Sequence, residues 1–439
     1  MKKACAILLF AFSALWARGE GDFNLQRVDN WHQWRGPNGN GVAPRGSPPI
    51  RWNEELNVRW KREIPGEGSG TPIVWGDQVF VVTAIETDRE SDISIPADAR
   101  ALTKPPGRYF RFVVMSFHRE TGAELWRRVA VVEVPHEGHH RTHSYAGASP
   151  VTDGARLFVS FGSRGIFCFD VSGNLIWKRD LGDMRTRYGW GEATSPVLHG
   201  DTLIVNWDHE DQSFIVALDA ETGVTRWKKE RDEPSSWATP LVAGFNDQTQ
   251  VIVNGASRVR SYDLTSGAVI WECGGLTINC IPSPVRIGET VICMSGYRGA
   301  AVLAIPLASK GDLTGTAQVA WNYSRGTPYV PSPILYDDQV YFTSVNRAIL
   351  TSLNVSDGKP VFEQERISGL GTLYSSPVGA LGHIYFVDRD GLTVVIKHGS
   401  APEVVARNQL EAQIDASPAI VGAQLFMRGR RSLYCIEKD

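Results

Sequence analysis

One dipeptide recurs along this chain at nearly constant spacing and restricts the folds that the chain can adopt. Ser-Pro or Thr-Pro opens a short apolar segment eight times, with the Ser or Thr at residues 71, 149, 195, 239, 283, 332, 376 and 417. All but the first spacing lie between 41 and 49 residues. A fixed period of this length is typical of propellers and solenoids, so the repeat constrains the fold before any catalytic motif does.

Each repeat contains the pattern of four short strands. In residues 195–227, apolar alternating runs are separated by Gly- and Asp-containing turns, and Trp227 ends the unit. The second half of this unit recurs at residues 116–126, 168–177 and 261–271, and in a degraded form at 352–362. Trp321 ends a further copy whose turn is lengthened by residues 309–316. Alternation and turn residues of this kind predict an antiparallel meander in every repeat.

The two ends of the chain predict a closed ring. The last repeat ends without its fourth strand, and a matching strand around Trp60 precedes the first repeat. A chain that lends its first strand to its last repeat removes two exposed edges. We therefore predict an all-β fold, a single eight-bladed β-propeller over residues 58–439, with residues 84–111 inserted in the first blade. An open β-solenoid would need capping repeats and would not explain the displaced strand.

The residues before the propeller predict export. Lys2 and Lys3 precede a run of about thirteen apolar residues, which is typical of a signal peptide over residues 1–19 and short of the roughly 20 that a spanning helix needs. Residues 20–57 are rich in turn residues. We expect a soluble protein of the periplasm or the exterior, without a membrane span. A net charge of −3 gives no reason to expect nucleic acid, and a closed ring requires no second copy.

The cysteines do not form a disulfide framework. Five remain after cleavage, an odd number at irregular spacing. We expect buried small side chains, and leave open a disulfide between Cys273 and Cys280.

The turns that end in Trp carry a resemblance to a known family. Residues 219–227 read Asp-x-x-Thr-Gly-x-x-x-Trp, and this turn looks like the tryptophan-docking motif of quinoprotein alcohol dehydrogenases. Over residues 55–439 the chain resembles the pyrroloquinoline quinone (PQQ)-like β-propeller repeat proteins, and it looks most like an exported bacterial subgroup of them. The outer-membrane assembly-factor propeller is similar in fold, but it is a lipoprotein, and this chain shows no lipid-attachment cysteine.

The resemblance implies a quinone cofactor, yet the quinone-site motifs are missing. No two cysteines are adjacent, no Cys-x-x-Cys-His haem motif is present, and nothing matches the calcium-binding or catalytic-Asp segments of those enzymes. The repeat resemblance therefore predicts the fold, and PQQ binding stays an alternative.

Arginines recur in the loops between second and third strands, on the face that would carry function. Six blades place one there: Arg164, Arg258, Arg298, Arg347, Arg389 and Arg430. A ring of guanidinium groups would favour a small anionic ligand. The alternative is that each arginine pairs with an acid on the same face, such as Glu192 or Asp415.

Two further groups belong to this candidate face. Arg187 and Trp190 precede an inner strand, with Trp237, Tyr329 and Tyr374 at related positions, and these aromatics could stack on a ligand or plug the channel. Asp208 and His209 occupy the loop where other blades carry Arg. This difference makes the loop of the third blade a sharper target for mutation than the repeat itself.

A histidine-rich loop is the candidate metal site. Four of the ten histidines lie within residues 136–143, and His139, His140 and His143 would be the ligands of an open site. The alternative is a polar loop whose imidazoles hydrogen-bond to strand ends.

The sequence thus favours an exported, non-catalytic propeller scaffold that binds an anionic ligand or a protein partner on its loop face. A PQQ-dependent oxidoreductase is the first alternative. A metal-dependent lyase or hydrolase that uses the histidine-rich loop is the second.

Overall fold

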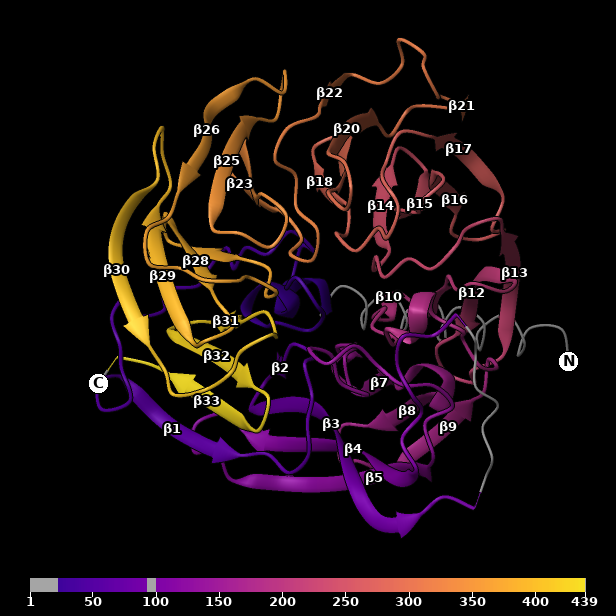
Figure 1. The fold of residues 1–439 in the computed structure, drawn as a ribbon, viewed down its shortest axis with the longest axis vertical. Helices are drawn as coiled ribbons and strands as arrows, with labels where there is room; N and C mark the ends of the chain where they lie inside the picture. Colours follow the sequence, from indigo (N-terminus) through magenta and orange to yellow (C-terminus); the bar gives the residue numbers. More distant parts are fainter. Residues whose placement is uncertain (1–22, 93–99, 439) are drawn as a thin grey trace, which may run out of the picture.

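Eight antiparallel sheets stand in a ring around one axis in the computed structural model, which describes residues 23–92 and 100–438 (Figure 1). The first four blades consist of β2 (Ile73–Trp75), β3 (Gln78–Glu90), β4 (Arg108–His118) and β5 (Glu124–Glu133); β6 (Val151–Thr152), β7 (Arg156–Ser160), β8 (Ile166–Asp170) and β9 (Leu175–Arg179); β10 (Val197–His199), β11 (Thr202–Trp207), β12 (Ser213–Asp219) and β13 (Thr225–Arg231); and β14 (Leu241–Phe245), β15 (Gln248–Val253), β16 (Val259–Asp263) and β17 (Val269–Cys273).

The other four blades follow the same order around the ring. They consist of β18 (Val285–Ile287), β19 (Thr290–Ser295), β20 (Ala301–Pro306) and β22 (Trp321–Tyr323); β23 (Ile334–Tyr336), β24 (Gln339–Thr343), β25 (Ile349–Asn354) and β26 (Pro360–Arg366); β27 (Val378–Ala380), β28 (His383–Val387), β29 (Leu392–Lys397) and β30 (Glu403–Gln409); and β31 (Ala419–Val421), β32 (Gln424–Gly429), β33 (Ser432–Ile436) and β1 (Val58–Glu63).

The ring closes as the sequence predicts. β1 pairs antiparallel with β33, placing Trp60 opposite Cys435, so the N-terminal strand completes the last blade. The all-β, eight-bladed fold is confirmed. Cys273 and Cys280 are buried free thiols.

The repeated Ser or Thr lies next to the axis and links neighbouring blades. In seven of the eight, from Thr71 to Ser376, the backbone N–H donates to the side-chain hydroxyl of the counterpart in the next blade, at 2.9–3.2 Å. The following Pro has no N–H to satisfy at the start of the inner strand. The dipeptide therefore builds a belt of hydrogen bonds around the channel.

The Trp that ends most of the repeats lies at the periphery, where it joins neighbouring blades. Trp177 donates its indole N–H to the carbonyl of Ala220 in the next blade, and its ring covers Gly223. Trp126 makes the same contacts with Val171 and Gly173. Trp271 differs, since it donates to Gln250 within its own blade, while β21 (Gly311–Asp312), from the lengthened turn, pairs parallel with β17.

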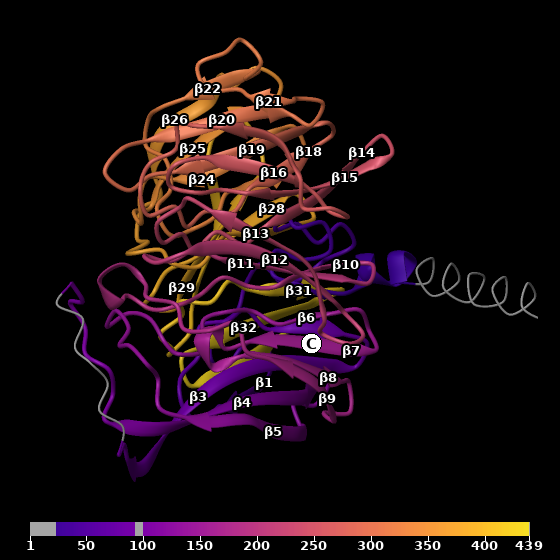
Figure 2. The same cartoon turned by 90° about the vertical axis from the view of Figure 1, so that its right-hand side faces the viewer.

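The two faces of the ring differ in what covers them. The loop face carries the loops between second and third strands and the connections between blades, and the turn face carries the tight turns. β3 and β4 extend beyond the other blades on the loop side, whereas the indigo N-terminal segment lies at the centre of the turn face (Figure 2). The 3₁₀ helices η1 (Arg27–Asp29), η2 (Gly162–Arg164) and η3 (Arg187–Gly189) complete the described elements.

Buried contacts hold the N-terminal segment in place. Trp31 pairs with Val74 through two backbone hydrogen bonds. Arg35 is buried and donates to the carbonyls of Pro333 and Pro377, both at 2.7 Å. The expected signal peptide, residues 1–19, lies outside the described residues. None of the helices in the described part of the chain has the length and apolar character that crossing a bilayer requires.

Candidate functional site

The channel on the propeller axis is narrow. Its cavity measures about 140 Å³ and is lined by six of the eight Ser and Thr residues of the belt, together with Trp34, His143, Trp237, Tyr374 and Asp415. Pockets for drug-sized ligands start at roughly 300 Å³, and the lining holds no Arg or Lys. A tricyclic quinone with three carboxylates therefore does not fit this channel.

Four of the arginines singled out in the sequence are neutralised by neighbouring acids. Arg164 pairs with Glu133 and Asp183, and Arg258 pairs with Glu272 and Asp312. Arg389 and Arg430 share Asp415, and Arg430 also contacts Glu67. Ion pairing of this kind removes most of the positive potential that a ring of arginines would create.

Three other arginines keep their charge available on the loop face. No carboxylate partner is found within the described residues for Arg187, Arg298 or Arg347. Arg298 and Arg347 are exposed. The guanidinium of Arg187 lies 5.3 Å from the ring centre of Tyr188, and that of Arg298 lies 5.3 Å from the ring centre of Tyr297.

Aromatic side chains gather around the channel mouth. Trp190 lies 5.2 Å from Tyr188 and 6.5 Å from Trp237, and Tyr297 lies 4.7 Å from Tyr329, measured between ring centres. Burial raises the pKa of Tyr329 to about 12, and Tyr297, Tyr374 and Arg187 are close enough to influence it. We define the mouth patch as the half-buried residues Tyr188, Trp190, Trp237, Tyr297, Tyr329, Tyr374 and Arg187, together with the exposed Arg298 and Arg347.

Asp208 and His209 are buried and have partners within the protein. Asp208 is buried, with its carboxylate 2.6 and 3.0 Å from the guanidinium of Arg231 and 2.6 Å from the hydroxyl of Ser236. Both side chains of the Asp208–Arg231 pair are fully buried. His209 is also buried, and its ring contacts the carbonyl of Gln212. Both side chains are thus engaged inside the protein, and a ligand contact at these two residues stays a prediction.

The three histidines expected to form a metal site do not converge. The rings of His139 and His143 contact the carbonyls of His140 and Glu192, and the ring of His140 contacts the hydroxyl of Thr142. A different group, His136, Glu137 and Glu192, brings one ligand atom from each residue within 4.8 Å of the others.

The acids of this second group already have hydrogen-bond donors. Glu192 accepts from the backbone N–H and the hydroxyl of Ser163, and Glu137 accepts from the same two groups of Thr186. Burial raises the pKa of Glu192, which disfavours its charged form. The bonds of Glu137 tie the histidine-rich loop to the connection that follows the second blade, and those of Glu192 tie this connection to the second blade.

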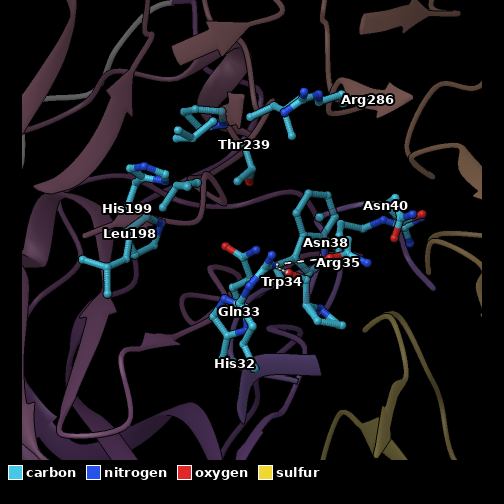
Figure 3. A pocket seen from close by; sticks show the side chains of 18 of the residues that line it. His32, Gln33, Trp34, Arg35, Asn38, Asn40, Leu198, His199, Thr239 and Arg286 are labelled. Atoms are coloured by element: carbon cyan, nitrogen blue, oxygen red, sulfur yellow. Dashed lines mark hydrogen bonds between the residues drawn. The ribbon is translucent and has the colours of Figure 1, made fainter. Parts of the chain in front are cut away.

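A larger cavity lies on the opposite face. It measures about 710 Å³ and lies between the N-terminal segment and the tight turns of the second to fifth blades (Figure 3). Trp34 lines both this cavity and the channel. The sequence had indicated only a turn-rich segment here, and the one available signal was its density of Trp, Asn and Arg over residues 31–40.

His32, in the wall of this cavity, gives a prediction for stability against pH. Burial, and to a lesser degree Arg27, lower the pKa of His32 from 6.5 to about 3. Between these values the unfolded chain binds the proton and the folded chain does not, so stability falls as pH falls below 6.5. From pH 7.5 to 4.5 this residue should contribute about 3 kcal/mol to the loss.

The measurement is chemical denaturation at both pH values, with His32→Gln as the matched variant. We expect the variant to lose less stability on acidification than the native protein. Equal losses would contradict a neutral, buried His32.

Comparisons with known proteins agree on the architecture. The family model described as outer membrane protein assembly factor BamB matches residues 111–364. The crystal structure of BamB from Moraxella catarrhalis is similar at 14% identity and a TM-score of 0.57, covering 81% of this chain and 98% of that one. No curated protein matches the sequence.

Two dehydrogenase structures are similar as well. A europium-containing methanol dehydrogenase has 11% identity and a TM-score of 0.62, covering 92% of this chain and 91% of its own. The quinohemoprotein alcohol dehydrogenase from Comamonas testosteroni has the same identity and TM-score, covering 95% and 82%. At these identities the likeness shows the fold alone.

Proposed function

The chain belongs to the family described as outer membrane protein assembly factor BamB, and from this premise we propose that it is a non-catalytic scaffold that binds a protein partner through the mouth patch. The observation that carries the proposal is the composition of that patch. Tyr, Trp and Arg are the residues most enriched at the energetic centres of protein interfaces. Six aromatic rings gather at one opening, and Arg187, Arg298 and Arg347, in loops on the same face, have no acidic partner within the described residues.

The charges indicate the character of the partner. Arg298 and Arg347 are exposed, and Arg187 lies over an aromatic ring. An unpaired guanidinium beside an aromatic ring suits a carboxylate framed by apolar side chains. We therefore expect a partner that places acidic residues at the mouth. The extended strands β3 and β4 would add contact area beside it (Figure 2).

Charge reversal at the mouth is the test of this proposal. The double variant Arg298→Glu, Arg347→Glu should lose at least tenfold in partner affinity, because both changes oppose an acidic surface. A photo-cross-linking residue at Tyr297 should form one discrete adduct in the intact cell envelope, and that adduct should disappear in the double variant.

The control positions lie on the turn face. A cross-linker at Leu381, which is 72% exposed, should not form the same adduct, and Arg45→Glu should leave the Tyr297 adduct intact. The proposal fails if both positions give the same products or if charge reversal leaves the adduct unchanged.

The quinoprotein alternative has its own test. The purified protein is incubated with PQQ and calcium and then separated from free quinone. We expect no retained quinone absorbance and no dye-linked oxidation of alcohols, because the channel is too small and lacks cations. Retained quinone together with alcohol oxidation would contradict the scaffold function and favour an oxidoreductase.

We also propose that the protein is exported to the cell envelope. The pattern of Lys2, Lys3 and the following apolar run supports this location, as does the family description. Terminal sequencing of the mature protein should give a start near residue 20, and retention of Met1 would argue against export.

A further inference from the structure

The cavity on the turn face, at about 710 Å³, takes no part in the proposed scaffold function. This volume lies within the range of roughly 300–1,000 Å³ typical of small-molecule sites. Figure 3 shows Trp34 and Gln33 near its middle, with Leu198 and His199 on one side and Arg286 on the other.

One side of the cavity is an apolar platform. The prolines of three successive repeats line it, Pro196, Pro240 and Pro284, together with Leu198 and Leu241. Trp34 is half-buried, so part of its indole remains free to contact a ligand. An indole face flanked by proline rings is suited to the C–H faces of a saccharide ring as well as to an aromatic ring.

The charge of the lining is positive. Arg27, Arg35, Arg156 and Arg286 line the cavity with one acid, Asp153. Asp153 is already paired with Arg156 at 2.7 Å. Arg286 donates to the carbonyl of Gly288, and Arg27 to that of Pro37. No carboxylate in the described part of the chain pairs with Arg27, Arg35 or Arg286, so the cavity carries excess positive charge that an anionic ligand would neutralise.

The polar groups of the N-terminal segment add hydrogen-bonding capacity. His32 is 4% exposed, lines the cavity, and its Nδ1 atom has no partner. The side chains of Asn38 and Asn40 use their oxygens within the segment, accepting from Arg27 and from the backbone of Val42. Gln33 uses its nitrogen, donating to Gly36. The side-chain nitrogens of Asn38 and Asn40 can therefore donate to a ligand, and the side-chain oxygen of Gln33 can accept from one.

We propose that this cavity binds an acidic saccharide, with a sugar ring on Trp34 and a carboxylate or sulfate group at Arg286. A polyhydroxylated ring uses the mixed donors and acceptors of Gln33, Asn38 and Asn40, which an aromatic carboxylate would leave unmatched. The net charge of the lining selects an acidic sugar over a neutral one.

The experiment is calorimetric titration of the full mature protein at low ionic strength. The probes are trigalacturonate, a heparin tetrasaccharide and an alginate trimer, with maltotriose as the neutral saccharide and benzoate as the non-saccharide ring anion. We expect at least one acidic saccharide to bind at least tenfold more tightly than maltotriose and benzoate, and to weaken as salt is added.

Two variants locate the binding. Arg286→Gln removes a charge from the cavity and should weaken the acidic probe at least tenfold while leaving the weak binding of maltotriose unchanged. Arg258→Gln, on the loop face, should bind like the native protein. Thermal unfolding of both variants separates loss of binding from loss of fold.

Three results would overturn the inference. They are no binding of any acidic saccharide at low salt, equal binding by benzoate, and equal binding by Arg286→Gln. The mouth-patch proposal does not depend on any of them, because its cross-linking test uses residues on the other face.

Discussion

Replacing Asp208 by Asn is expected to lower the free energy of unfolding by about 3–5 kcal/mol. The carboxylate of Asp208 is the only acid paired with Arg231 among the described residues, and both side chains are fully buried. Asn keeps the size of the side chain and some hydrogen bonds but removes the charge. Arg231 would then hold an uncompensated charge in the interior, where Asp208 now raises its pKa. Urea denaturation at neutral pH measures the loss.

Two further variants test whether the loss of stability comes from the buried charge of Arg231 and not from the replacement of an acid in general. Asp211→Asn removes an acid that pairs with Arg185 at the surface and is 56% exposed, so its effect should stay below about 1 kcal/mol. Replacing the pair together, as Asp208→Leu with Arg231→Met, should recover much of the lost stability because no charge remains buried. A loss below 1 kcal/mol in Asp208→Asn would show that water reaches Arg231.

The same pair shows why the burial of Asp208 could not be predicted from the sequence. Asp208 stands in a loop between second and third strands, as the arginines of other blades do, and the pattern therefore suggested a ligand contact. Its partner is 23 residues away on the outer strand β13, and Ser236 follows in the connection to the next blade. No local pattern indicates which polar loop residues turn inward to meet such partners.

The architecture was predictable because its signals are local and repeated. The Ser/Thr-Pro dipeptide and the turn ending in Trp each recur at the repeat period, and both proved to join neighbouring blades. The displaced strand around Trp60 required only the count of strands in the last repeat. Repetition averages out the weakness of any single pattern, which is why the number of blades and the ring closure were correct.

The sites were less predictable because they depend on pairs of residues from different blades. Six arginines at equivalent loop positions look alike in sequence. Four of them meet acids, namely Arg164, Arg258, Arg389 and Arg430, whereas no acid within residues 23–92 and 100–438 pairs with Arg298 or Arg347. The N-terminal segment carried no repeat at all. Its cavity exists because Arg35 fastens the segment to carbonyls some 300 residues away along the chain.

Gly223→Ala is expected to destabilise the propeller by about 2–5 kcal/mol, through two separable effects. Gly223 has φ of +71°, in the left-handed region, which costs an L-residue roughly 1–2 kcal/mol. An added Cβ would also lie 2.8 Å from two ring atoms of Trp177, where overpacking costs about 1–3 kcal/mol. The indole would have to move, and with it the hydrogen bond to Ala220 that joins the second and third blades.

Gly382→Ala separates these effects, because Gly382 has a similar φ of +75° and nothing within 4 Å of its would-be Cβ. Its destabilisation should equal the backbone cost alone, so the difference between the two variants measures the docking of Trp177 against the turn. The double variant Gly223→Ala, Trp177→Leu should be destabilised by less than the sum of the two single variants, because the smaller Leu side chain no longer clashes with the added Cβ. Equal destabilisation by Gly223→Ala and Gly382→Ala in thermal and urea unfolding would show that the contact of Trp177 with the turn does not stabilise the packing of the second blade on the third.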